Sequence, residues 1–444
     1  MADFHTIARH PAMLLAWLPL LVGLQGIPHT GALRTLFLLL GIAHTIWLAR
    51  SRPAVPPGSA AGVEKVLFWA LTAWLLVQSA LIAQDSSLSL NMLAGDWGKL
   101  LIMMALGWSV ARVAPSRRWL VVALFAGAFL HVASTLGRQL FSLLTVGGLA
   151  VRQSLLADYA LTSPFTTTAL AWLLADGAAR IWHGRSLFPW SAPVTAVLAL
   201  LTLAAESLLM AKSGQVITAI LILVASLSLL RHPRIKRHWS IGIAIGGLCA
   251  IGLVVVVGAS RWSGLQESFR AAWHEPIPVQ AVIGDDAPIA SNLNHSFYMR
   301  AVRARVGIEG VAEHPWGLGF DPDVFSRYVT QRFAIPQGIS SSNSGLIDFT
   351  LANGIIGAAL LLLLAASLMR RGWRTFVAGR PEGAALGLLV LHQLARYTLD
   401  GTLGGSRFTG IGLIIGAVWA MSVMAKDEPS VSFVPVRADA DLDQ

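Results

Sequence analysis

The chain has little charge and almost no cysteine. Of its 444 residues, 13% are charged and 55% are hydrophobic. A soluble globular chain carries about 25% charged residues, so this composition excludes an ordinary soluble domain. The single cysteine, Cys249, lies inside an apolar run, which excludes disulfides within the chain and cysteine metal sites. Most of the sequence consists of apolar runs of roughly 20 residues, the length that crosses a bilayer.

The apolar runs predict an all-α polytopic membrane protein, because backbone groups in lipid must be hydrogen-bonded within each segment. We expect about twelve transmembrane helices, at 11–27, 32–49, 65–84, 98–113, 118–136, 163–182, 189–211, 213–230, 239–258, 345–369, 382–399 and 405–424. The chain then divides into transmembrane helices 1–9 (1–258), one large loop that contains helices (259–344), transmembrane helices 10–12 (345–424) and a polar tail expected to be cytoplasmic and disordered (425–444).

The net charge of +10 fits an oriented membrane protein and is no evidence for nucleic acid binding. If the N-terminus is cytoplasmic, every loop on that side is basic, with Arg50, Arg52, Lys65, Arg112, Arg117, Arg118, Arg180, Arg185, Arg231, Arg234, Lys236, Arg237, Arg370, Arg371, Arg374 and Arg380. The loop at 85–97, on the other side, has no Lys or Arg. We therefore expect both termini in the cytoplasm. The loops on the outer side would be 137–162, 207–212, 259–344 and 400–404.

The stretch 259–343 is the one long polar segment. Within it, 296–313 is predicted to be a helix because Phe297, Ala301, Ala304 and Ile308 recur at helical spacing. Pro315 should end this helix, since the residue before a proline disfavours the α region. A glycine-rich turn, Gly317-Leu318-Gly319, follows.

Cations on the outer side are the candidate binding residues. Arg300 and Arg303 are three positions apart and should share a helix face. Arg152 precedes the sixth span, and Lys212 lies in a tight turn between the seventh and eighth spans. Arginine binds phosphate with two parallel N–H groups and lysine supplies a point charge, so several converging cations would suit a lipid-linked diphosphate. Arg152 would equally suit an interfacial anchor, and Lys212 could pair with Glu206.

Other polar residues allow more than one interpretation. Asp348, at the outer end of the tenth span, is either a charge favoured by the helix dipole or a catalytic carboxylate. His314 is either a loop residue or a base. His392, Gln393, Arg396 and Asp400 form a polar patch that would line a cavity or bridge helices. No metal site is expected, because the histidines of the spans lie in separate segments without ligand spacing.

Several motifs resemble the O-antigen ligase family. The stretch Arg300–Phe320, with His314-Pro315-Trp316-Gly317-Leu318-Gly319-Phe320, is similar to the large periplasmic loop of that family. Three further motifs also resemble the family, and the order and spacing of all four fit it better than any one alone. The three are Arg152 with Ser163-Pro164, the turn Lys212-Ser213-Gly214, and the helix start Asn343–Gly357. The likeness covers roughly 150–420.

One position departs from the family pattern. The family usually has His-Asn where this chain has Ser342-Asn343, and the histidine is assigned to activating the acceptor hydroxyl. Serine is not a general base at neutral pH. Another group would have to replace the histidine, with Asp348, His314 and His295 as candidates. Otherwise departure of the diphosphate carries most of the catalysis, or the chain is inactive as a transferase.

The resemblance implies a glycosyltransferase of the bacterial inner membrane whose active site faces the periplasm. It would move a glycan from undecaprenyl diphosphate to lipid A–core oligosaccharide. The protein would be surrounded by membrane lipids, and the reaction would need no metal or cofactor. Arg300 and Arg152 would bind the donor diphosphate, with support from Lys212 and Arg303. Arg300, Asp348 and His314 would be the catalytic candidates, and Ser342 and Asn343 would lie at the acceptor end.

Three alternatives stay open at this point. A polysaccharide polymerase or a protein O-oligosaccharyltransferase of the same family would share the donor and differ in the acceptor. A transporter is the alternative from another class, but no paired broken helices from related halves are evident and the loop is strongly asymmetric. The sequence does not specify the glycan, the acceptor sugar or the oligomeric state.

Overall fold

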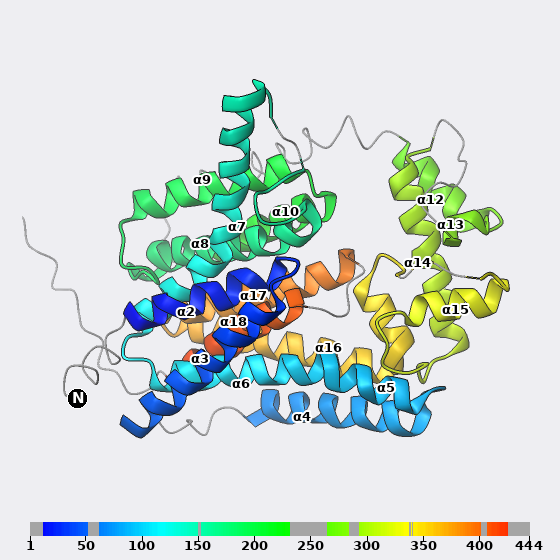
Figure 1. Ribbon diagram of the computed structural model, residues 1–444, viewed down its shortest axis with the longest axis horizontal. Coiled ribbons are helices and arrows are strands. Elements are labelled where there is room, and N and C mark those ends of the chain that lie inside the picture. Colours follow the sequence, from blue (N-terminus) through cyan, green and yellow to red (C-terminus); the bar gives the residue numbers. More distant parts are fainter. Residues whose placement is uncertain are drawn as a thin grey trace, which may run out of the picture.

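The computed structural model describes residues 12–51, 62–149, 152–230, 264–283, 293–336, 339, 341–400 and 406–424. Within these ranges the regular elements are helices, and one isolated β-bridge joins Gln153 to Asp158. Figure 1 shows most helices running side by side along the long axis, with a smaller group at one end. The predicted all-α class therefore holds for the described part of the chain.

Each predicted apolar range that falls on described residues coincides with a helix, and 239–258 lies outside them. Helices long and apolar enough to cross a membrane are α3 (Gly31–Ser51), α4 (Gly62–Val77) continued by the π-helical turn η2 (Gln78–Ile82), α7 (Arg117–Val146), α9 (Ala192–Leu209), α10 (Lys212–Leu230) and α16 (Gly345–Val377). The shorter or more polar ones are α2 (Ala12–Gly23) with η1 (Leu24–Gly26), α6 (Gly98–Val113), α8 (Tyr159–His183), α17 (Pro381–Leu399) and α18 (Ser406–Met424). The structure therefore has the long apolar helices of a membrane protein. Helix α7 extends to Val146, so the predicted loop at 137–162 is shorter than expected.

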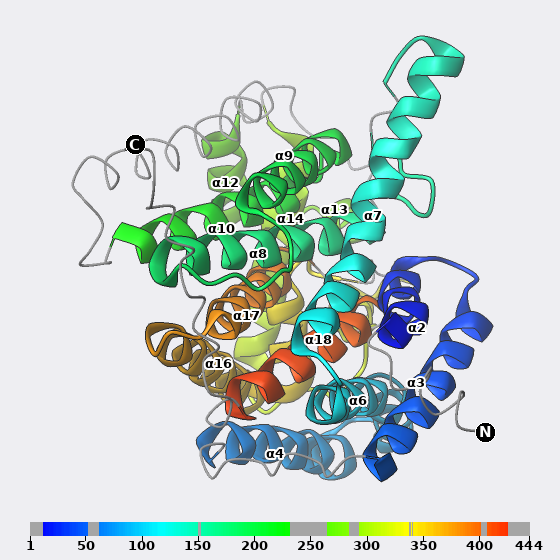
Figure 2. The same ribbon diagram turned by 90° about the vertical axis from the view of Figure 1, so that its left-hand side faces the viewer.

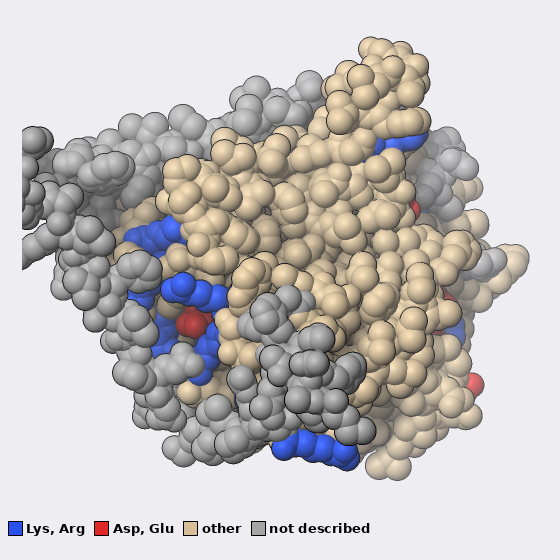
Figure 3. Space-filling model, turned by 60° about the vertical axis from the view of Figure 1, so that its left-hand side comes forward, with Lys and Arg blue, Asp and Glu red and all other residues tan. Residues whose placement is uncertain are grey.

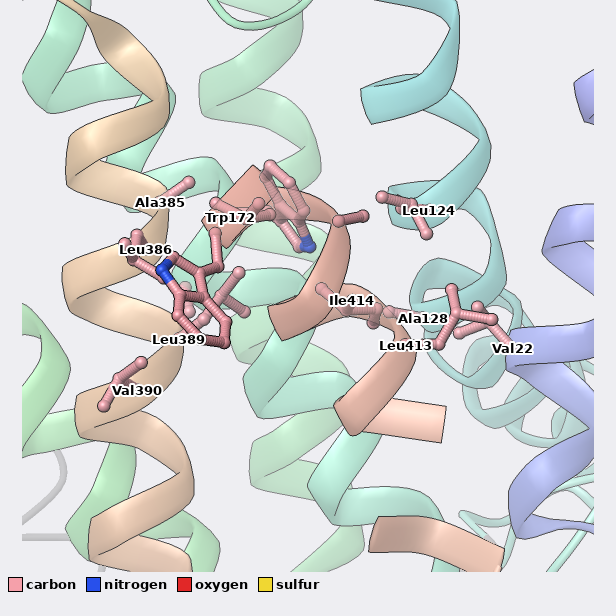
Figure 4. Packing of buried hydrophobic residues seen from close by; sticks show 14 of the residues in the cluster. Val22, Leu124, Ala128, Trp172, Ala385, Leu386, Leu389, Val390, Leu413 and Ile414 are labelled. Carbon is pink, nitrogen blue, oxygen red and sulfur yellow. The ribbon is translucent and has the colours of Figure 1, made fainter. Parts of the chain in front are cut away.

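The helices form three layers, which Figure 2 shows from the end of the bundle. Helices α8, α9 and α10 lie on one side, α16, α17 and α18 in the middle, and α3, α4 and α6 on the other side. Figure 4 shows the apolar centre, where Trp172 of α8 lies near side chains of α17 and α18, and Leu413 of α18 lies toward Ala128 of α7 and Val22 of α2.

Small residues allow the closest helix contact. A Cβ at Gly107 of α6 would lie 2.1 Å from the carbonyl oxygen of Leu413. A Cβ at Gly416 of α18 would lie 2.4 Å from the carbonyl oxygen of Met104. Glycine therefore brings the backbones of α6 and α18 together, as is common between membrane helices.

The long polar segment forms a separate helical layer at one end of the bundle (Figure 1). It contains α12 (Leu265–His274), α13 (Gln280–Ile283), α14 (His295–Glu313) and α15 (Val324–Phe333). The predicted helix at 296–313 is confirmed as α14, and it ends before Pro315. The segment has its own apolar core, in which Val306, Phe325 and Val329 pack with Leu351 of α16.

The glycine-rich turn after α14 docks on a break in α16. Gly354 has φ 70° and ψ 175°, which interrupts that helix. The carbonyl groups released by the break are paired: Leu318 N donates to Leu351 O at 2.9 Å, and Gly319 N donates to Ala352 O at 2.9 Å. Trp74 Nε1 of α4 donates to Asn353 O at 2.8 Å. The turn therefore joins the polar segment to the membrane helices through backbone hydrogen bonds.

A second contact fixes the turn from the other side. Phe320 N donates to Ser89 Oγ at 2.7 Å, and Gln84 N donates to Leu318 O at 3.2 Å. Ser89 belongs to α5 (Ser86–Met92), which is followed by the π-helical turn η3 (Leu93–Trp97). The motif 314–320 thus serves as the structural connection between α14, α16 and α5.

The opposite end of the bundle is basic. In Figure 3, which brings the left-hand side of Figure 1 forward, Lys and Arg side chains surround an acidic one in a hollow. Arg185 Nη1 donates to Gly379 O at 2.8 Å, and Arg380 Nη2 donates to Met421 O at 2.9 Å. Arg371 pairs with Glu64 at 2.8 Å. Arg371 of α16, together with Arg185 after the end of α8 and Arg380 directly before α17, thus holds together the helix ends on this side.

Candidate functional site

A buried polar cluster lies where α8, α9, α10 and α17 meet. Its centre is Arg396 of α17, which is 5% exposed. The Arg396 guanidinium donates to Asp400 Oδ2 at 2.6 Å and to Ser213 Oγ at 3.2 Å. It also donates to Ser163 Oγ at 2.8 Å and to Thr167 Oγ1 at 3.1 Å. One arginine therefore connects α17 with α8 and α10, because its planar group carries donors in several directions.

Glu206 of α9 completes the buried cluster. It accepts hydrogen bonds from Ser163 Oγ at 2.7 Å and from the Thr166 hydroxyl. A Cβ at Gly214 would lie 1.7 Å from Glu206 Oε1, so only glycine fits beside this carboxylate. The contacts explain two residues of the turn Lys212-Ser213-Gly214. Ser213 accepts a hydrogen bond from Arg396, and Gly214 leaves space for the Glu206 carboxylate.

The predicted diphosphate-binding cations Arg152, Lys212 and Arg300 border the same end of the bundle. Arg152 N donates to Leu208 O in the last turn of α9 at 3.1 Å, and its guanidinium lies 5.6 Å from the Tyr159 ring centroid. Lys212 is the first residue of α10, directly before Ser213. Arg300 reaches the cluster from the polar segment.

Arg300 is half-buried on α14. Its Nη1 donates to Leu399 O at the end of α17, at 3.3 Å. Leu399 directly precedes Asp400, whose carboxylate pairs with Arg396 and whose carbonyl accepts from Gly345 N at 2.8 Å. The end of α17 therefore connects the cluster, Arg300 and the start of α16.

Arg303 has a different environment. It is 4% exposed, and its Nε donates to Ala281 O of α13 at 3.0 Å. This hydrogen bond places the guanidinium inside the polar segment, against α13. Arg300 and Arg303 both lie on α14, as predicted, but their guanidinium groups bond to different partners: Arg300 to Leu399 O and Arg303 to Ala281 O.

Asp348, Ser342 and Asn343 form the corner where the polar segment enters α16. Asp348 is 1% exposed and accepts from Ser341 Oγ at 2.8 Å and from Ser342 N at 3.0 Å. Ser342 is fully buried, and its Oγ donates to Ser344 O at 3.0 Å. Asn343 has φ 65°, and no hydrogen bond joins its buried Nδ2 to a described residue. The carboxylate of Asp348 thus holds this corner.

His314 lies far from Arg300. It directly follows α14, fourteen positions after Arg300, which is roughly 21 Å along a helix. Its ring meets Tyr328 edge-on, with ring centroids 6.0 Å apart. Burial and a hydrogen bond to Glu313 raise the pKa of Tyr328 to about 12, so this phenol stays protonated at neutral pH. The structure therefore does not bring His314 and Arg300 into one site. His295, at the start of α14, is exposed.

Arg396 and Glu206 were not among the predicted binding or catalytic residues. The sequence carried a signal for Arg396, since a charged residue inside an apolar helix tends to face polar partners. Its partners were not evident, because serines and threonines are common in the spans. His392 is part of the same network: its Nε2 lies 2.8 Å from Thr167 Oγ1.

Among the described residues, no group of three or more His, Cys, Asp or Glu side chains could hold a metal ion. A comparison with protein-family models finds no match, and a search of curated proteins finds none. The fold and the site thus define a class: a helical membrane protein with a buried polar cluster around Arg396 and further cations at the same end of the bundle.

Proposed function

We propose that the chain is a membrane glycosyltransferase of the O-antigen ligase type. It takes a glycan from undecaprenyl diphosphate and transfers it to a hydroxyl of lipid A–core oligosaccharide, at the periplasmic face of the inner membrane. The proposal combines the family resemblance of 150–420 with the grouping of Arg152, Lys212 and Arg300 around the ends of α9, α10 and α17.

The observation that carries the proposal is the position of Arg300. Among described residues its guanidinium makes one hydrogen bond, to Leu399 O. An arginine offers five N–H donors, so most of them remain available to a ligand beside the cluster. A diphosphate is suited to this group because two of its oxygens can accept parallel N–H bonds.

The reaction is a direct displacement. The acceptor oxygen bonds to the anomeric carbon while the bond from that carbon to the diphosphate oxygen breaks. The bonding electron pair leaves with the diphosphate, and the proton of the acceptor hydroxyl passes to water or to the departing diphosphate. Negative charge grows on the leaving group, and Arg300, Arg152 and Lys212 stabilise it. Preorganised cations of this kind contribute about 10²-fold or more in rate.

The proton acceptor is not Ser342, since a buried hydroxyl that donates to Ser344 O is not a base. Asp348 is engaged by Ser341 and Ser342, which supports its structural role at the corner. We therefore assign most of the catalysis by this chain to stabilisation of the departing diphosphate.

The proposed topology has twelve spans, with both termini in the cytoplasm. It is supported by the basic residues at the end of the bundle opposite α12–α15 (Figure 3), because positive loops stay in the cytoplasm. The end with Arg300 would then face the periplasm, where lipid-linked glycans meet lipid A–core.

Reconstitution of the purified protein with lipid-linked glycan tests the proposal. Lipid A–core, a second lipid-linked glycan and a pilin-like protein are offered as separate acceptors. Transfer to lipid A–core is expected. Growth of the glycan on its lipid alone would indicate a polymerase, and glycosylation of the pilin-like protein alone would indicate a protein O-oligosaccharyltransferase. Either result, or no transfer to any acceptor, would overturn the ligase assignment.

A further inference from the structure

A cavity lies between helices that take no part in the buried polar cluster around Arg396. It has a volume of about 460 Å³ and is bounded by η1, α3, α6 and α18, with Asp96 of η3 at its edge. In Figure 1 these helices lie beside one another on the side of the bundle away from α8, α9 and α10. Arg34 and Lys99 lie in the first turns of α3 and α6 and line one end of the cavity, which we take as its entrance because Lys99 is exposed.

The entrance carries an excess of positive charge. Arg34 and Lys99 are cations and Asp96 is an anion, which leaves one net positive charge. Among the described residues, no hydrogen bond or ion pair engages the guanidinium of Arg34 or the ammonium of Lys99. Charged side chains at the ends of apolar helices, without protein partners, tend to bind an ion.

The walls below the cations are apolar. Leu38 lies four positions after Arg34 on α3, and Ile102 lies three positions after Lys99 on α6, so each shares a helix face with its cation. Leu38 is half-buried and Ile102 is 49% exposed. Both helices thus present a positive charge at the membrane surface and an apolar side chain one turn deeper.

The polar groups at the inner end are already paired. Thr409 Oγ1 donates to Gln25 Oε1 at 3.0 Å, and Gln25 Nε2 donates to Leu21 O at 3.0 Å. A ligand therefore needs no polar group at its deep end. The chemistry that fits is an anion at the entrance with a hydrocarbon chain attached.

We propose that this cavity binds a glycerophospholipid with one net negative charge. Its phosphodiester lies between Arg34 and Lys99, and an acyl chain runs along Leu38 and Ile102. The single charge of a phosphodiester balances the single excess charge of the entrance. The proposal does not depend on the transferase assignment, because it uses none of the residues of the buried polar cluster around Arg396.

Binding to the delipidated full-length protein tests the site, with phosphatidylglycerol, phosphatidylcholine and soluble glycerol 3-phosphate as separate probes. Phosphatidylglycerol is expected to bind, and the other two are expected to bind at least tenfold more weakly. Equal binding of phosphatidylcholine would overturn the role of charge. Equal binding of glycerol 3-phosphate would overturn the role of the acyl chain.

Three variants locate the site. Arg34→Gln with Lys99→Gln should weaken phosphatidylglycerol binding at least tenfold, since each cation near an anionic lipid contributes a several-fold effect. Arg50→Gln, at the exposed far end of the same helix α3, should leave binding unchanged. Asp96→Asn removes the opposing charge and should strengthen binding several-fold, a gain that misfolding does not produce. Unchanged binding in the double variant, or no gain in Asp96→Asn, would overturn the proposal.

Discussion

Replacing Gly354 by alanine should separate the polar segment from the membrane helices. Gly354 adopts φ 70° and ψ 175°, a conformation that glycine alone adopts readily, and another residue there costs about 1–3 kcal/mol. The added Cβ would also lie 2.6 Å from the carbonyl carbon and oxygen of Trp316, which are backbone atoms and cannot rotate away. Such overpacking costs about 1–3 kcal/mol more. Together the loss is about 2–6 kcal/mol, a large part of a typical net stability of about 5–15 kcal/mol.

The assay is thermal unfolding of the purified protein in detergent, followed by limited proteolysis of the segment that contains α14 and α15. Gly354→Ala should melt at a lower temperature and be cleaved faster in that segment. Gly177→Ala is the matched control, because that glycine lies inside α8 and a Cβ added there would meet nothing within 4 Å. Alanine there should be neutral or stabilise by up to about 1 kcal/mol. Wild-type melting and cleavage in Gly354→Ala would refute the docking of the turn on α16.

Three further predictions follow from the cluster and the corner. Arg396→Met should lower the free energy of unfolding by about 3 kcal/mol, because it leaves Asp400 and the buried hydroxyls without their donor; a change below about 0.5 kcal/mol in denaturation would contradict this. Asp348→Asn weakens the bonds from Ser341 and Ser342 and should cost about 1–3 kcal/mol, whereas full stability with loss of transfer would favour a catalytic carboxylate. Chelation of divalent ions should leave transfer unchanged, and loss of activity restored by one metal would contradict a metal-independent displacement.

The sequence was sufficient to predict the long apolar helices that the structure describes, and α14. Apolar runs predict the long helices, and the spacing of Phe297, Ala301, Ala304 and Ile308 predicts α14. The buried face of α14 is a different one, since it includes Val302 and Val306 while Ile308 is 48% exposed. The short helices α12, α13 and α15 were not predicted, because few turns give too little periodic signal. Without α13 there was no reason to expect that Ala281 O holds Arg303.

The contacts of the candidate site were harder to predict because they join distant segments. Arg396 was recognised as part of a polar patch, but its partners Ser163 and Ser213 come from two other helices. The glycine-rich turn was expected from Gly317 and Gly319. Its docking on α16 was not, because backbone-to-backbone hydrogen bonds leave no pattern in the side chains.

The most direct test of diphosphate binding is the transfer rate of Arg300→Ala with undecaprenyl diphosphate-linked glycan and lipid A–core. Arg270→Ala is the control, since Arg270 is an exposed arginine of α12 in the same polar segment. We predict that Arg300→Ala reduces transfer by about 10²-fold or more without a change in melting temperature, while Arg270→Ala retains the wild-type rate. A wild-type rate in Arg300→Ala would contradict the central claim that this arginine holds the departing diphosphate.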